Sequence, residues 1–166
     1  MSRELSRPLY HLGNIELLNN YKVGLLCSRK LPASIILKTY DWAIEQRDKG
    51  VCIVSGFHSK IEKDVFDILI KGKQPIILIL ARGLKKRREP IIDSLIEDNR
   101  LLIITPFQEN IKRITEDTAK IRNEIIVSIS DEIMLPYTNE NGNIQKVIKS
   151  VRSSVNIQTL IDDEKN

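Results

Sequence analysis

The chain has 166 residues, of which 42% are hydrophobic and 29% are charged, and its formal net charge at pH 7 is +4. This composition is typical of a soluble globular protein, and the mild positive charge is compatible with a polyanionic partner without requiring one. No apolar run approaches the roughly 18 residues that span a bilayer and the N-terminal residues lack the apolar stretch of a signal peptide, so we expect a cytoplasmic protein with no membrane partner.

Short apolar runs alternate with longer segments of helical periodicity along the chain. The runs are rich in Ile, Val and Leu without polar alternation, which is the pattern of parallel strands covered on both faces. In chain order this pattern predicts strands at residues 23–27, 51–55, 75–80, 101–105 and 132–135, and helices at residues 34–49, 61–71, 89–99, 115–130 and 143–153.

Strands that alternate with helices predict an α/β fold: a doubly wound, mostly parallel sheet of about five or more strands with helices on both faces. We expect one domain over residues 1–166, with the first dozen residues and residues 162–166 as loose tails. Local signals place the helix ends. Ser34 is a candidate N-cap of the first helix, Gly50 is suited to end it, and Pro90 falls in the first turn of the third.

Cations stand next to hydroxyl groups and glycines where several predicted strands end. Ligands of an open parallel sheet bind beyond the carboxyl ends of the strands, where helix N-termini point outward, and these residue types are the components of a phosphate site. The candidates are Ser28, Arg29 and Lys30 after the first strand, Ser55, Gly56, Phe57, His58 and Lys60 after the second, and Arg82 and Gly83 after the third. The alternative is that the cations only solvate loops.

Other residues near these ends have two interpretations. Phe57 and Phe107 follow strands, where a nucleobase could stack on them, although a packing role is also open. Arg122 and Asn123 interrupt an otherwise apolar helix face, so that Arg122 either pairs with a nearby acid or reaches into the pocket. The basic run at residues 85–88 fits a solvated helix start, although cations there oppose the helix dipole, which favours a functional role.

The sequence contains no recognisable catalytic constellation. His11 and His58 are the only histidines, and nothing identifies the acid of a triad; a Walker loop and a GxGxxG fingerprint are also absent. Cys27 and Cys52 lie in apolar runs without a CxxC motif, so we expect reduced, buried thiols. We therefore expect a binding protein rather than an enzyme, with no metal site and no cofactor.

Four segments in this order and spacing resemble the Rossmann-like domain of the DprA/Smf DNA-processing proteins, most closely their short, single-domain members. The segments are KVGLLCSRK, GVCIVSGFHSKIEKD, PIILILARG and RNEIIVSISDEIM, and the similarity extends over residues 12–135. The family's Gly-Ser-Arg after the first strand reads Cys27-Ser28-Arg29 here. Its Ser-Gly after the second strand corresponds to Ser55-Gly56, and its helical Arg-Asn to Arg122-Asn123.

The resemblance implies a homodimer that binds single-stranded DNA in a basic pocket at the strand ends, with a RecA-type recombinase as a possible further partner. Ser28, Arg29, Ser55, Gly56, Arg122 and Asn123 are the positions that inherit pocket roles from it. Two alternatives stay open. The same pocket could hold one nucleotide-derived ligand, or the chain could be a nucleotide N-glycosidase of the related LOG type, for which Glu62 is the available carboxylate; the glycine-rich loop of that type is missing from residues 135–146.

Overall fold

One mixed sheet organises the molecule, as seen in a computed structural model that describes residues 7–138, 142–152 and 154–161. Its seven strands lie in the order β1-β5-β4-β3-β2-β6-β7. Neighbouring strands from β5 across to β7 are parallel, and β1 pairs antiparallel with β5 at one edge. The strands are β1 (Tyr10–Gly13), β2 (Lys22–Leu25), β3 (Cys52–Ser55), β4 (Ile76–Ile79), β5 (Leu101–Thr105), β6 (Glu132–Met134) and β7 (Asn156–Gln158).

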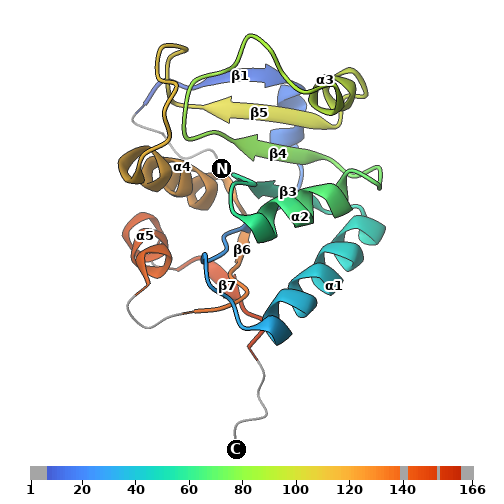
Figure 1. Cartoon of the computed structure of the whole chain (residues 1–166), viewed down its shortest axis with the longest axis vertical. Coiled ribbons are helices and arrows are strands. Elements are labelled where there is room, and N and C mark those ends of the chain that lie inside the picture. Colours follow the sequence, from blue (N-terminus) through green and yellow to red (C-terminus); the bar gives the residue numbers. More distant parts are fainter. Residues whose placement is uncertain (1–6, 139–141, 153, 162–166) are drawn as a thin grey trace, which may run out of the picture.

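Helices cover both faces of this sheet (Figure 1). The helices α1 (Ala33–Lys49), α2 (Lys60–Leu69) and α3 (Pro90–Glu97) pack on one face, where Trp42, Val65 and Leu95 join its core. The opposite face is covered by the 3-10 helix η1 (Ile15–Asn19), α4 (Glu116–Ile129) and α5 (Asn143–Val151), through Leu17, Ile126 and Ile148. Burial on both faces explains why the central strands are apolar without alternation.

The predicted fold class is confirmed, and each of the ten predicted strands and helices is present close to its expected bounds. The structure adds β1, η1 and β7. Residues 10–12 therefore belong to a strand and not to a loose tail, whereas residues 1–6 and 162–166 lie outside the described part of the chain. Both added strands are short edge strands with little buried surface, so they lack the continuous apolar pattern that reveals the central ones.

The helix ends agree with the local signals, with one exception. Gly50 ends α1 in the left-handed conformation at φ 75°, and Pro90 occupies the first turn of α3. Ser34 does not cap α1: the helix begins one residue earlier at Ala33, after Pro32, and no side chain caps it. The carbonyl of the N-cap residue Pro32 accepts the N–H groups of Ile35 at 3.0 Å and Ile36 at 3.1 Å, so the first turn of α1 closes on the backbone without a capping hydroxyl.

Candidate functional site

Arg122 of α4 lies directly against the backbone of Gly56, the residue that follows β3. A Cβ atom on Gly56 would stand 2.7 Å from Cδ, 2.8 Å from Nε and 2.9 Å from Nη1 of Arg122. The Arg122 side chain is almost wholly buried, with 8% relative exposure, and its Nε donates a hydrogen bond to Oδ1 of Asn123 at 3.2 Å. The fold thus brings together the Ser55-Gly56 and Arg122-Asn123 pairs, which are 66 residues apart in the chain.

The charges around Arg122 are predominantly positive. Burial lowers the pKa of the Arg122 guanidinium, while the Glu62 carboxylate acts against that shift. Burial also lowers the pKa of His58 below its ordinary value of 6.5, and the positive charges of Arg122, Lys63 and Arg29 lower it further against Glu62. His58 is therefore mostly neutral at pH 7, and the cluster carries an excess of positive charge that an anion would offset.

Arg82, which follows the end of β4, supplies a second guanidinium to the cavity that Arg122 lines. Its Nη1 donates to the Gly83 carbonyl at 3.2 Å, and burial lowers its pKa. The hydroxyl of Thr105 donates to the Arg82 carbonyl at 2.6 Å, which ties this loop to the end of β5. In the described part of the chain neither Arg82 nor Arg122 forms an ion pair with a carboxylate.

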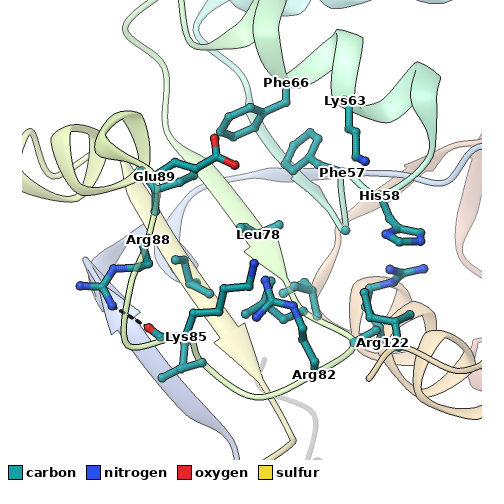
Figure 2. A pocket seen from close by; sticks show the side chains of 18 of the residues that line it. Phe57, His58, Lys63, Phe66, Leu78, Arg82, Lys85, Arg88, Glu89 and Arg122 are labelled. Carbon is teal, nitrogen blue, oxygen red and sulfur yellow. Dashed lines mark hydrogen bonds between the residues drawn. The ribbon is translucent and has the colours of Figure 1, made fainter. Parts of the chain in front are cut away.

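Both guanidiniums line a cavity of about 600 Å³ between α2, β4 and α3. Figure 2 shows Arg82 and Lys85 close together at its rim, and Arg122 farther along the rim beside His58. Apolar side chains form most of the remaining wall; they are Phe57, Phe66, Ile70, Leu78, Ile79, Leu80, Ala81, Leu84, Ile91, Ile92, Ile103 and Ile114. The cavity therefore combines an apolar interior with a cationic rim, as small-molecule sites commonly do.

Phe57 belongs to the core rather than to an exposed stacking surface. Its side chain has 7% relative exposure, and its ring centroid lies 5.0 Å from that of Phe66 at a tilt of 59°. Its backbone adopts a positive φ of 45°, which directs the chain from β3 into α2. Phe57 can contact a ligand only from inside the cavity. Phe107 does not line this cavity, and its N–H donates to Oγ1 of Thr105.

The remaining sequence candidates lie outside this cavity. Ser55 is fully buried and its hydroxyl accepts the Phe57 N–H at 3.2 Å, so it holds the turn and does not face solvent. Lys60 is largely exposed and its ammonium pairs with Asp64 at 2.7 Å. Gly83 is buried at a second cavity of about 880 Å³, where its N–H donates to the Ile111 carbonyl at 2.8 Å.

The residues after β2 occupy the same edge of the sheet but are more open. Ser28 is half-buried, and Arg29 and Lys30 are exposed. Arg29 is close enough to lower the pKa of His58. It can therefore join the positive potential around Arg122 without lining the cavity, whereas nothing in the structure links Lys30 to it.

Sequence reasoning missed the structural role of Glu62. This carboxylate has 6% relative exposure and accepts the N–H of Cys27 at 3.1 Å, of His58 at 3.0 Å and of Ser59 at 3.2 Å. It therefore occupies the backbone amides at the end of β2 and the start of α2, where a phosphate would otherwise be held. The spacing Ser59-x-x-Glu62, a capping box, was the available signal.

Among the described residues no group of three or more His, Cys, Asp or Glu side chains could hold a metal ion. No helix in the described ranges is both long and apolar enough to cross a bilayer. Cys27 and Cys52 are buried free thiols, and burial raises the pKa of each, that of Cys52 to about 12.

Comparison with known proteins gives a family match and several structural matches, two of them to DNA processing proteins. The sequence matches the family of DNA recombination-mediator protein A over residues 3–152. DNA processing protein A from Helicobacter pylori, described as a binder of single-stranded DNA, superposes with a TM-score of 0.75 at 17% identity over 98% of this chain and 77% of that one. DNA processing protein A from Streptococcus pneumoniae superposes with a TM-score of 0.74 at 16% identity.

The second match covers 95% of this chain and 56% of the Streptococcus pneumoniae chain, so this chain spans little more than half of that protein. At these identities the two structures show a shared fold. A search of curated proteins found no match.

Proposed function

This chain belongs to the DNA recombination-mediator protein A family, and from that premise we propose that it binds single-stranded DNA through the cationic cluster around Arg122. The observation that carries the proposal is the pair of guanidiniums, Arg82 and Arg122, that line one cavity without a carboxylate partner in the described part of the chain. Arg122 is buried and Arg82 half-buried, and Glu62 acts on Arg122 without forming an ion pair with it in the described part of the chain. A buried cation without a paired acid is costly, and a phosphate supplies the missing charge.

The proposed contacts begin at the cavity and extend along the edge of the sheet. Arg122 and Arg82 donate to phosphate oxygens, because a guanidinium presents several donors in a planar fork that suits them. Lys85 adds a third positive charge at the same rim. Arg29, with Ser28 beside it, takes a neighbouring phosphate, since its charge already reaches His58. The amide of Cys27 takes no part, because Glu62 occupies it.

Salt titration of binding to the 12-mer dT12 tests this proposal. Each phosphate neutralised on a single strand contributes about −0.7 to the slope of log K against log salt. We expect Arg82→Gln and Arg122→Gln each to weaken binding about tenfold and to make the slope shallower by about 0.7, because each removes one charge-assisted contact. Fluorescence anisotropy at several salt concentrations measures both quantities.

Lys49→Gln is the matched control. It removes one positive charge from the last turn of α1, where Lys49 pairs with Glu45 at the opposite edge of the sheet from the strand ends. We expect it to leave the affinity and the slope unchanged. If Arg82→Gln and Arg122→Gln behave like this control while the protein stays folded, the phosphate site is wrongly placed.

A single nucleotide-derived ligand is the second candidate function, and the cavity volume of about 600 Å³ favours it, because small-molecule sites occupy roughly 300–1,000 Å³. Such a ligand carries few phosphates, so the slope of log K against log salt for the natural ligand would correspond to about one phosphate contact rather than several.

A glycosidase acting through Glu62 is not supported, since that carboxylate is buried and engaged by three backbone N–H groups. Base release from nucleoside monophosphates is the assay that would overturn this judgement.

Loading of a RecA-type recombinase and formation of a homodimer stay predictions for this chain. Analytical ultracentrifugation of the purified chain tests the second.

A further inference from the structure

The cavity beside Arg122 has two chemically different sides. Its interior is formed by Phe66 of α2, Leu78 of β4 and Ile92 of α3, together with the edge of the core residue Phe57. The cations Arg82 and Arg122 lie on one side, and the carboxylate of Glu89 lies on another, directed toward the ring of Phe66 (Figure 2). Lys63, Arg87 and Arg88 also line the cavity. A ligand that fills this space therefore meets Arg82 and Arg122 on one side and, among further cations, the Glu89 acceptor on another.

Glu89 is free to serve a ligand. It is the N-cap residue of α3, but its side chain accepts no hydrogen bond from that helix. Within the described ranges its carboxylate also takes no part in an ion pair, although Lys85 and Arg88 are near it in the chain. Arg88 instead pairs with Asp93 at 2.8 Å and donates to the Lys85 carbonyl at 2.9 Å.

We propose that this cavity binds one nucleobase of the DNA strand and that Glu89 makes guanine the preferred base. The inference rests on the proposed function, because the phosphate of the same nucleotide is held by Arg82 and Arg122. A nucleotide has the required polarity: an anion at one end, a flat ring that packs on apolar and aromatic side chains, and hydrogen-bonding groups on the far edge of that ring.

The preference for guanine follows from the chemistry of a carboxylate. An ionised Glu89 is an acceptor only. Guanine places two donors side by side on its Watson–Crick edge, N1–H and the 2-amino group, and both can bind the two carboxylate oxygens. Adenine and cytosine place an acceptor nitrogen next to their amino group, and thymine has one N–H between two carbonyl oxygens. Glu89 is exposed in the free protein, so each of these bases would have to displace water from the carboxylate and then set an acceptor against it, which is costly.

Competition experiments with deoxynucleoside monophosphates test the base preference. Each of dGMP, dAMP, dCMP and dTMP is titrated against fluorescent dT12 bound to the protein. We expect dGMP to compete about tenfold better than the other three, because a bidentate contact discriminates at that level. We expect dIMP, which lacks the 2-amino group, to fall between dGMP and dAMP.

Glu89→Gln separates recognition from simple electrostatics. If Glu89 reads the base, the variant loses the preference for dGMP about tenfold while its affinity for dTMP does not fall. If Glu89 only repels the polyanion, all four nucleotides bind the variant more tightly by the same factor, and the inference is wrong. Glu97→Gln, which makes the same charge change at the other end of α3 and outside the cavity, is expected to have no effect on base preference.

Two more variants test whether Glu89 sets the base preference and whether the base lies in this cavity. Asp67 of α2 is the other carboxylate that lines the cavity; if Asp67→Asn, and not Glu89→Gln, abolishes the preference, then Glu89 is the wrong residue. Ile91 of α3 lines the cavity with 39% relative exposure, so Ile91→Trp fills the space without entering the core. We expect it to remove the preference for dGMP and to leave the salt slope for dT12 unchanged.

The failure of this inference is distinguishable from the failure of the proposed function. Equal competition by the four monophosphates, with steep salt dependence of dT12 binding intact, overturns the base site alone. Absence of dT12 binding in the folded wild-type protein overturns both.

Discussion

Arg122 is the residue on which the proposed site most depends, and its position depends in turn on Gly56. The Gly56 Cα carries no Cβ, and the space that a Cβ would take is filled by the Arg122 side chain. The glycine is needed here because of this close approach, since its φ is not in the left-handed region. The Ser55-Gly56 pair is thus a packing partner of the guanidinium rather than a direct phosphate ligand.

We predict that Gly56→Ala weakens dT12 binding about tenfold and changes the free energy of unfolding by less than about 1 kcal/mol, because the flexible Arg122 side chain moves away from the added methyl group. Gly50→Ala is the control with the opposite pattern. Its φ of 75° is strained for alanine although no atom lies within 4 Å of the new Cβ, so it should cost about 1 kcal/mol and leave binding unchanged. Anisotropy and urea denaturation measure the two quantities.

His58 predicts how stability and binding respond to pH. Its folded-state pKa lies below the ordinary value of 6.5, so the unfolded chain binds more protons between these two values. The contribution of His58 to the free energy of unfolding is therefore fully present above pH 6.5, and it is lost as the pH falls from 6.5 through the lower pKa of the folded state. We expect the unfolding free energy of His58→Gln to fall less between about pH 7 and pH 5 than that of the wild type. If the unfolding free energies of His58→Gln and the wild type fell equally over this pH range, the prediction would be wrong.

The same residue should report the bound phosphate. A phosphate offsets the positive charge of Arg122 and Lys63, so addition of dT12 should raise the pKa of His58 toward its ordinary value. By linkage, dT12 affinity then increases as the pH falls through the interval between the free and bound pKa values. An NMR titration of the imidazole with and without dT12 measures the shift. An unchanged pKa would place the phosphate away from His58.

At the scale of elements, the start of α2 is built around an internal anion. The Glu62 carboxylate accepts hydrogen bonds from three backbone N–H groups, one of them just after β2. In return the Ser59 side chain accepts the N–H of Glu62, which completes a capping box. The helix therefore contributes the position of His58 and Lys63 to the site, while Glu62 accepts the N–H of the N-cap residue Ser59 and the Ser59 hydroxyl accepts that of Glu62. This arrangement moves the proposed anion site from β2 toward the ends of β3 and β4.

We predict that Glu62→Gln lowers the free energy of unfolding by about 2 kcal/mol, because charge-assisted hydrogen bonds to a buried carboxylate are replaced by weaker ones and an amide N–H₂ faces backbone donors. Ser59→Ala, which removes only the capping hydroxyl, should cost about 1 kcal/mol. Urea denaturation compares the two. A Glu62→Gln variant as stable as the wild type would show that the carboxylate is not needed as a structural anion and would reopen a catalytic role for it.

At the scale of the whole molecule, the carboxyl ends and the amino ends of the parallel strands have different roles. The carboxyl ends of the strands carry the cationic cavity, whereas the opposite edge is held together by Arg100, just before β5. Its guanidinium donates to the carbonyls of Gln74 at 3.2 Å, Ile70 at 3.2 Å and Leu69 at 3.3 Å, and burial lowers its pKa. Arg100 thus joins the end of α2 to the strands on which the cavity rests.

We predict that Arg100→Met destabilises the fold by about 2 kcal/mol, because three carbonyl groups lose their donor, and that it leaves dT12 affinity and its salt slope unchanged. The measurement is urea denaturation together with anisotropy at a temperature where the variant is folded. If Arg100→Met weakened dT12 binding as much as Arg122→Gln, the prediction that Arg100 supports only the stability of the fold would be wrong.

The central strands and most helix boundaries could be predicted because their signals are local. Apolar runs such as Ile76–Ile79 and Leu101–Thr105 read as buried strands by themselves, and Gly50 and Pro90 mark helix ends through their own backbone preferences. The edge strands β1 and β7 were missed because each depends on a partner strand and buries little apolar surface of its own.

From the sequence we could predict only that the site lies at the carboxyl ends of the parallel strands and that it is positively charged. Parallel strands present their carboxyl ends at one edge, so the sequence by itself determined that Arg29, His58 and Arg82 share that edge with the ends of β2, β3 and β4. Tertiary packing decided the rest: that Arg122 fills the space above Gly56, that Phe57 turns into the core, and that Glu62 satisfies the amide of Cys27. These contacts join residues far apart in the chain, and no local pattern encodes which buried polar groups will satisfy one another.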